Sequence, residues 1–192
     1  MICRLSHDRR GATAVEFALI LPVLLMLVLG SFELGLAQYL RSVLEGAMQQ
    51  AGRNSSLQSG PASQGQIDAF VRAQVQAVFP GASVEFARSN YSTFSDVSAP
   101  EDFTDSNANG RYDSGECYVD LNDNRRWDSD RSKSGQGGAN DVVLYTATVT
   151  YTSTLPVAGL GLSPVQRLTS STTLRNQPFS SQTSRTAVQI CT

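Results

Sequence analysis

The stretch GATAVEFALILPVLLMLVLGSFELGLAQYLRSVLEGAMQQAGR, residues 11–53, decides the fold of this chain. Its first half is apolar all round except for Glu16 and Glu33, and it is long enough to cross a hydrocarbon core, which needs about 20 apolar residues. Its second half repeats apolar residues at helical spacing, with polar residues between them. We therefore predict one helix over residues 12–53, membrane-compatible at first and amphipathic later, with Gly52 as its stop signal.

The residues before this stretch, MICRLSHDRRG, carry three Arg and one Asp. A basic flank tends to stay in the cytoplasm, which directs the rest of the chain to the exported side of the membrane. Glu16 is unusual at the start of an apolar helix, because an ionisable group inside a membrane is costly to bury and usually has a partner.

The segment from Gly11 to Phe17 resembles the cleavage region of type IV pilin-like precursors, and residues 11–53 resemble the TadE-like minor pseudopilins of the tight-adherence (Tad) pilus. The resemblance implies that a prepilin peptidase cuts between Gly11 and Ala12, so that Glu16 and Phe17 become the fifth and sixth mature residues. It also implies that Glu16 pairs with the new amino terminus of its own or a neighbouring subunit. A carboxylate near a helix N-terminus is favoured by the dipole, and a nearby ammonium offsets its burial. The other interpretation is a plain membrane anchor with an incidental glutamate.

Composition excludes several classes of function. The 192 residues carry a net charge of −2 with no basic patch, so nucleic acid is not an expected partner. The single His, His7, lies in the predicted leader, so the mature chain lacks the commonest general base, and no G-x-S-x-G or cofactor motif is present. We therefore expect no enzyme.

Three cysteines are present, and Cys3 would be lost with the leader. The other two, Cys117 and Cys191, would both lie on the exported side, where an oxidising compartment favours their pairing. The alternative is two unrelated buried thiols.

A second informative stretch is EDFTDSNANGRYDSGECYVDLNDNRRWDSDR, residues 101–131, with nine acidic and four basic residues. Its first part fits the calcium-loop pattern D-x-[DN]-x-[DN]-G-x5-E, in which alternate oxygen side chains point into a tight loop, a glycine permits the turn and a glutamate closes the site. The hard oxygen donors favour calcium over zinc or copper. The predicted ligands are Asp105, Asn107, Asn109, the Arg111 carbonyl, Asp113 and Glu116.

The pattern recurs fifteen residues later, although Arg125 replaces the glycine and Arg131 the closing glutamate. The candidate ligands of this copy are Asp120, Asn122, Asn124, Asp128 and Asp130. The second copy shares an ion with the first, binds weakly or is only a polar turn. No helices are predicted on either side, so we expect paired loops outside an EF-hand frame, closer to dockerin or thrombospondin repeats; a solvated acidic loop is the alternative.

The remaining patterns predict an α+β head over residues 54–192. A polar linker at 54–63 precedes a helix that Pro80 and Gly81 end, and alternation predicts strands at 82–87, 143–151 and 168–174, with an edge strand near 187–190. Residues 132–140 are predicted to be flexible, and the apolar run 155–164 to be a hairpin connection or buried loop. The long helix should pack on an antiparallel sheet with residues 101–131 inserted between strands.

These observations together predict a leader at 1–11, a helix at 12–53 and an exported head. The function expected from the resemblance is that of a minor pseudopilin of the inner membrane, and of the extracellular pilus after assembly, with prepilin peptidase, pilus subunits and the Tad machinery as partners and calcium as the bound ion. The alternative is an uncleaved, membrane-anchored calcium-binding adhesion module of the bacterial envelope.

Overall fold

The computed structural model describes residues 10–57, 61–153, 163–176 and 186–191. Most of the predicted leader and the run 155–162 lie outside these ranges. The helices and strands, in chain order, are α1 (Arg10–Leu57), α2 (Pro61–Val78), β1 (Ser83–Tyr91), the 3₁₀ turn η2 (Phe94–Asp96), β2 (Tyr118–Asp120), β3 (Lys133–Ser134), β4 (Val142–Thr152), β5 (Val165–Arg175) and β6 (Val188–Ile190).

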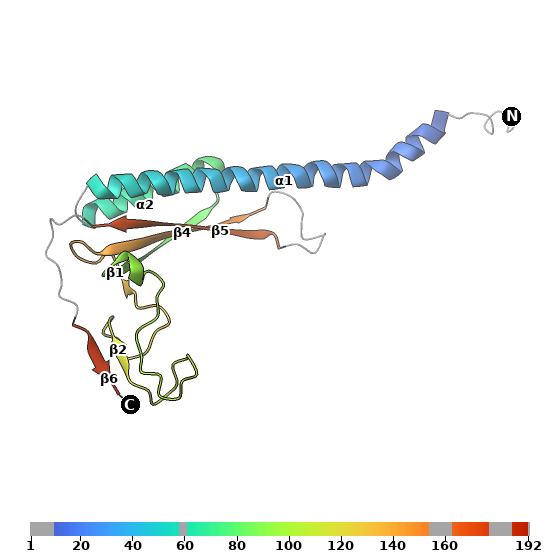
Figure 1. The fold of residues 1–192 in the computed structure, drawn as a ribbon. Helices are drawn as coiled ribbons and strands as arrows, with labels where there is room; N and C mark the ends of the chain where they lie inside the picture. The colour runs from blue at the N-terminus through green and yellow to red at the C-terminus, as the bar shows by residue number, and fades with distance from the viewer. Residues whose placement is uncertain (1–9, 58–60, 154–162, 177–185, 192) are drawn as a thin grey trace, which may run out of the picture.

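The fold is α+β, as predicted, with a long apolar N-terminal helix, one further helix and an antiparallel sheet. The N-terminal part of α1 projects beyond the head and bends there (Figure 1). Pro22, which lacks a backbone N–H donor, lies inside this helix. Among the described residues, α1 is the one helix long and apolar enough to cross a membrane, judged by length and composition.

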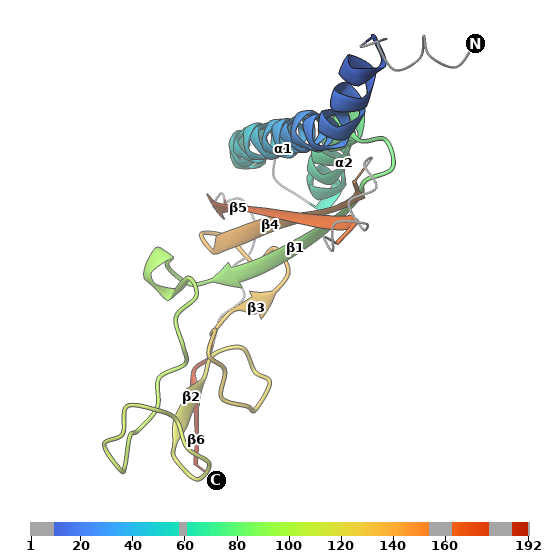
Figure 2. The ribbon, with the colours of Figure 1, turned by 90° about the vertical axis from the view of Figure 1, so that its right-hand side faces the viewer.

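The main sheet has the strand order β3-β1-β4-β5, and every pairing in it is antiparallel. Both helices cover the same face of it (Figure 2). The register aligns Val84 with Val149 and Val149 with Leu168, so one inward apolar row crosses three strands. Side chains alternate between the faces of a strand, which explains why the period-two pattern of β4 predicted this strand well.

The core lies between this row and the amphipathic half of α1. Leu40, Leu44 and Met48 of α1 are each at most 1% exposed, and Val71 and Val75 of α2 are fully buried against them. Burying a Leu, Val or Met side chain contributes about 1.5–3 kcal/mol, so this stripe holds α1 on the head.

Two predicted helix boundaries were wrong. The predicted stop at Gly52 lies inside α1, which continues to Leu57. A Cβ at Gly52 would meet Leu174 Cδ2 of β5 at 3.3 Å, so this glycine allows the helix to approach the sheet closely. The second helix begins at Pro61, inside the predicted linker, in agreement with the preference of proline for a first helical turn.

The acidic stretch forms a separate lobe on the side of the sheet away from the helices (Figures 1 and 2). We define the loop lobe as residues 101–131 together with β6. It contains a second sheet, in which β2 pairs antiparallel with β6. Cys117, beside β2, is disulfide-bonded to Cys191, beside β6, across 74 residues of sequence. The disulfide ties the C-terminal segment to the loop lobe.

Two strand features differ from the sequence-based expectation. β1 runs to Tyr91, well past the predicted end at 87, because the whole strand pairs with β4. Lys133 and Ser134 form the short strand β3 within the segment predicted to be flexible, and they pair with Asn90 and Ser89 of β1. The buried Asn90 side chain donates to the Lys133 and Gly135 carbonyls and so fixes this segment.

Candidate functional site

The first candidate region is the start of α1. Gly11, Ala12, Glu16 and Phe17 all lie on this helix and are exposed. The buried residues that join α1 to the head begin at Leu40. The head therefore does not fix these four side chains in an isolated subunit.

This part of α1 presents a large apolar surface. The large hydrophobic side chains of α1 that are more than two-fifths exposed are Val15, Phe17, Leu19, Ile20, Val23, Leu24, Leu25, Met26, Leu27, Val28, Leu29, Phe32 and Leu34, followed by Tyr39. A contiguous apolar surface of this length marks a membrane or protein interaction site. The exposed side chains suit an apolar environment, whether lipid or other helices.

The second candidate region is the first acidic loop. Asp105 accepts hydrogen bonds from the backbone N–H groups of Asn109 (3.1 Å) and Gly110 (2.7 Å), which closes the turn around its carboxylate. Gly110 has a φ of +75°, a conformation that glycine adopts without strain. The Asn107 and Asn109 amides both donate to Asp113 Oδ2 at 2.7 Å, and these bonds lower the pKa of the Asp113 carboxyl.

Glu116 closes this loop from its far end. Its Oε1 accepts from Ser106 N at 2.8 Å and its Oε2 from Asp113 N at 3.0 Å, and the residue is only 6% exposed. The structure thus brings together the side chains that the sequence predicted as ligands of the first calcium loop. The backbone N–H of Arg111 donates to Asn109 Oδ1 (2.8 Å), which keeps Arg111 within the same turn.

The second loop repeats this geometry. Asp120 accepts from Asp123 N and Arg125 N, both at 2.7 Å, and the Asn122 and Asn124 amides donate to Asp128 Oδ2. Arg125 has a φ of +59°, so it adopts the left-handed conformation that Gly110 has in the first loop. The substitution at the glycine position therefore leaves the loop shape intact, at a conformational cost to Arg125.

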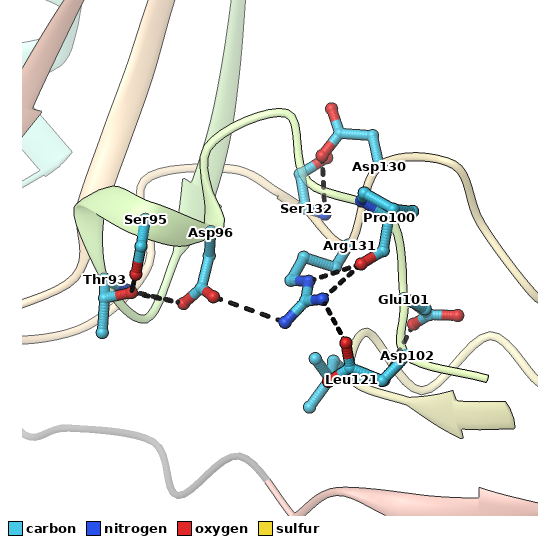
Figure 3. A network of polar contacts seen from close by, with 10 residues as sticks. All are labelled: Thr93, Ser95, Asp96, Pro100, Glu101, Asp102, Leu121, Asp130, Arg131 and Ser132. Atoms are coloured by element: carbon cyan, nitrogen blue, oxygen red, sulfur yellow. Dashed lines mark hydrogen bonds and ion pairs between the residues drawn. The ribbon is translucent and has the colours of Figure 1, made fainter. Parts of the chain in front are cut away.

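Two residues of the second copy lie elsewhere than the spacing suggests. Asp130 accepts a hydrogen bond from the Tyr91 hydroxyl at 3.0 Å and another from Ser132 N, and so it faces the main sheet rather than the loop. The Arg131 side chain contacts the Pro100 carbonyl, Asp96 and Asp102 (Figure 3).

Sequence reasoning missed Glu101. This residue precedes the first loop, is 1% exposed and accepts hydrogen bonds from Leu121 N (2.8 Å) and Asp128 N (3.2 Å) of the second loop. Burial raises the pKa of its carboxyl. The signal that would have found it is its position fifteen residues before Glu116, the offset of the whole repeat.

Aromatic residues pack between the two loops. Tyr112 and Trp127, equivalent positions in the repeat, stack with ring centroids 4.9 Å apart, and Phe103 meets both of them edge-on. Trp127 is the only tryptophan of the chain, and its Nε1 donates to the Glu101 carbonyl at 3.0 Å. Its fluorescence therefore reports directly on the loop lobe.

The donor set fits a hard cation such as calcium. Carboxylate, amide and carbonyl oxygens are the groups that calcium prefers, in sites of six to eight ligands. Within the described ranges, no three His, Cys, Asp or Glu side chains form a metal cluster by themselves. Each loop has Asn at its third and fifth positions, so an ion would need these amide oxygens beside the carboxylates. Calcium would hold Asp105, Asp113 and Glu116 together by neutralising their charges.

Comparison with known proteins gives one finding. The family model described as TadE-like protein matches residues 11–53, the stretch that became most of α1. No curated protein and no solved structure matches the chain. The match confirms the resemblance found from the sequence over this segment.

Proposed function

We propose that this TadE-like protein is a minor pseudopilin that is cut by a prepilin peptidase between Gly11 and Ala12 and takes part in building a Tad pilus. The observation that carries the proposal is the TadE-like match over residues 11–53 on a helix whose apolar side chains are exposed from Val15 to Leu34. The family relates the chain to the Tad pilus, and the helix is suited to membrane anchoring.

Assembly would exchange one apolar environment for another. Before assembly, lipid covers the exposed part of α1. In a pilus, the helices of neighbouring subunits cover it instead, and the Glu16 carboxylate pairs with a mature amino terminus. The partners are then prepilin peptidase, other pilus subunits and the assembly machinery, and the head stays on the exported side throughout.

Deletion of the gene in the source bacterium tests this role. We expect the deletion strain to yield fewer sheared pili and to attach more weakly to surfaces, and the full chain supplied on a plasmid to restore both properties. A deletion strain that is piliated and attaches as well as its parent would contradict the proposal.

We further propose that calcium stabilises the loop lobe, with the first loop as the primary site. Its support is the convergence of Asp105, Asn107, Asn109, Asp113 and Glu116 around one turn. In an exported head, calcium would stiffen the surface that lies farthest from α1 (Figure 1).

Calcium should raise the melting temperature of the full chain in detergent micelles by about 5–10 °C. At a hundredfold excess over Kd, a ligand adds about 2.7 kcal/mol, and 1 kcal/mol shifts the melting of a chain this size by about 2–4 °C. Asp105→Ala and Glu116→Ala should lose most of this shift, whereas Glu85→Ala, at an exposed site on β1, should keep it. Trp127 emission follows the melting transition. Equal melting temperatures of the unmutated chain in calcium and in chelator would refute calcium binding.

A further inference from the structure

In the first acidic loop, Asn109 is followed directly by Gly110, and both residues are exposed. The side-chain amide of an asparagine can be attacked by the backbone nitrogen of the next residue, and a glycine there has no side chain to hinder the attack. Glycine also reaches the backbone conformations that ring closure requires more readily than other residues. A Cβ built on Gly110 would meet nothing within 4 Å, so packing does not require this glycine.

The backbone nitrogen that would attack is hydrogen-bonded to a carboxylate. Gly110 N donates to Asp105 Oδ2 at 2.7 Å, which is within the reach that a general base needs for the proton it removes. Loss of this proton makes the Gly110 nitrogen a nucleophile. Asp105 therefore lies where a base for the first step of the reaction is needed.

The amide carbonyl that would be attacked is polarised by a second backbone group. Asn109 Oδ1 accepts a hydrogen bond from Arg111 N at 2.8 Å. A backbone N–H that points at an oxygen stabilises the negative charge that this oxygen gains during attack. Asn109 Nδ2 donates to Asp113 Oδ2 at 2.7 Å, so the nitrogen that would leave also has a carboxylate beside it.

The second loop has the same hydrogen bonds but no glycine. Arg125 N donates to Asp120 Oδ2 at 2.7 Å. Arg126 N donates to Asn124 Oδ1, also at 2.7 Å. Arg125 has a φ of +59°, close to the +75° of Gly110. The attacking residue of the second loop thus differs from that of the first by its side chain, and the protein contains its own control.

We propose that Asn109 is a self-modifying residue, which the first loop converts to aspartate and isoaspartate. Gly110 N loses its proton to Asp105 and bonds to Asn109 Cγ. The bond between Cγ and Nδ2 then breaks, and the proton held by Asp105 leaves with the released ammonia. Water opens the resulting succinimide at either of its two carbonyls, so water is the only other reactant.

The conversion would loosen the first loop. It replaces the amide donor of Asn109 by a carboxylate opposite Asp113, and like charges at this distance repel. It also adds a negative charge to a stretch, residues 101–131, that already has nine acidic and four basic residues. The first loop is therefore expected to open as the exported chain ages, whereas the second keeps its shape. This inference depends neither on calcium binding nor on a role in pili.

Incubation of the full chain in detergent at mildly alkaline pH tests the proposal, with chelator present so that no cation occupies the loop. Trypsin cuts after Arg111, so Asn109 is recovered in peptide 89–111 and Asn124 in peptide 112–125. Mass spectrometry after reduction of the disulfide measures the conversion of amide to acid in each peptide. We expect Asn109 to give both aspartate and isoaspartate, and Asn124 to stay intact over the same time.

Exchange of the attacking residues between the loops is the matched pair of variants. Gly110→Arg should abolish the conversion of Asn109, and Arg125→Gly should introduce a conversion at Asn124. Both variants should keep the loop shape, because the second loop already accommodates an arginine at this position. Asp105→Asn should slow the conversion of Asn109 about a hundredfold, since a general base contributes about 10²–10⁴-fold.

Trp127 emission checks that each variant keeps the loop lobe folded. Equal conversion of Asn109 and Asn124 in the parent, or no conversion of Asn109, would overturn the inference. Conversion of Asn109 at the parental rate in Gly110→Arg would overturn it as well. An unchanged or faster conversion in Asp105→Asn would overturn the assignment of Asp105 as the base.

Discussion

Asp68→Ala should lower the free energy of unfolding of the head by about 2–4 kcal/mol. Asp68 of α2 accepts two hydrogen bonds from the Arg88 guanidinium of β1 and one of 2.6 Å from the Tyr145 hydroxyl of β4, so it pins the helix to two strands. The Arg88 and Asp68 side chains are 14% and 22% exposed. Removing one partner of a buried ion pair costs about 3–5 kcal/mol, and the residual exposure here reduces that figure.

Tyr145 adds to this effect. Its ring lies 4.5 Å below the Arg88 guanidinium and stacks on Phe86, so the aspartate, the arginine and the tyrosine form one unit. Burial and the adjacent carboxylate of Asp68 raise the pKa of the Tyr145 hydroxyl, which keeps it a hydrogen-bond donor at neutral pH. Without Asp68, both the hydroxyl and the guanidinium lose their acceptor.

Urea denaturation of the full chain in detergent, followed by far-UV circular dichroism, measures this change. The matched control is Glu45→Ala, which removes the exposed pair of Glu45 with Arg41 on α1 and should change stability by less than about 0.5 kcal/mol. Equal urea midpoints for the two variants would show that the Asp68 network does not hold α2 on the sheet.

Glu16→Ala should reduce incorporation into pili at least about a hundredfold while leaving processing at Gly11 intact. In the assembled state, the Glu16 carboxylate and a mature amino terminus would be paired among apolar helices. An ammonium left there without its partner costs about 3–5 kcal/mol, and 1.4 kcal/mol is tenfold in an equilibrium constant.

Quantitative immunoblotting of sheared pili against membranes measures this ratio. Glu33→Ala is the matched control, because Glu33 is the other carboxylate of the apolar stretch and lies near Tyr151 of the head. The control should be incorporated nearly as well as the parent. Equal incorporation of Glu16→Ala and Glu33→Ala would contradict the assembly role of Glu16.

The elements that local patterns specify were predictable from the sequence. The apolar run of α1 and the strict alternation of β4 and β5 depend on nearest neighbours, and these elements appear where expected. Gly52 was misinterpreted because its reason is a contact with Leu174, far away in the chain. Strand β3 was missed because two residues carry no periodicity, and its support comes from the side chain of Asn90.

In the loop lobe, too, the local features were predictable from the sequence and the long-range contacts were not. The turn of the first loop followed from its spacing alone, since the side chains that converge in it are all local. The hydrogen bonds of Glu101 to the second loop depend on the long-range bridge between Phe103 and Tyr118, which no local motif encodes. Only the fifteen-residue offset, applied backwards from Glu116, contains that information.

The amino-terminal residue of the protein recovered from the bacterial envelope tests the central claim most directly. N-terminal sequencing of the subunit from membranes and from sheared pili should begin at Ala12, followed by Thr13, Ala14, Val15 and Glu16. A chain that begins at Met1 in both fractions would contradict processing, and would identify the protein instead as an uncleaved membrane-anchored module.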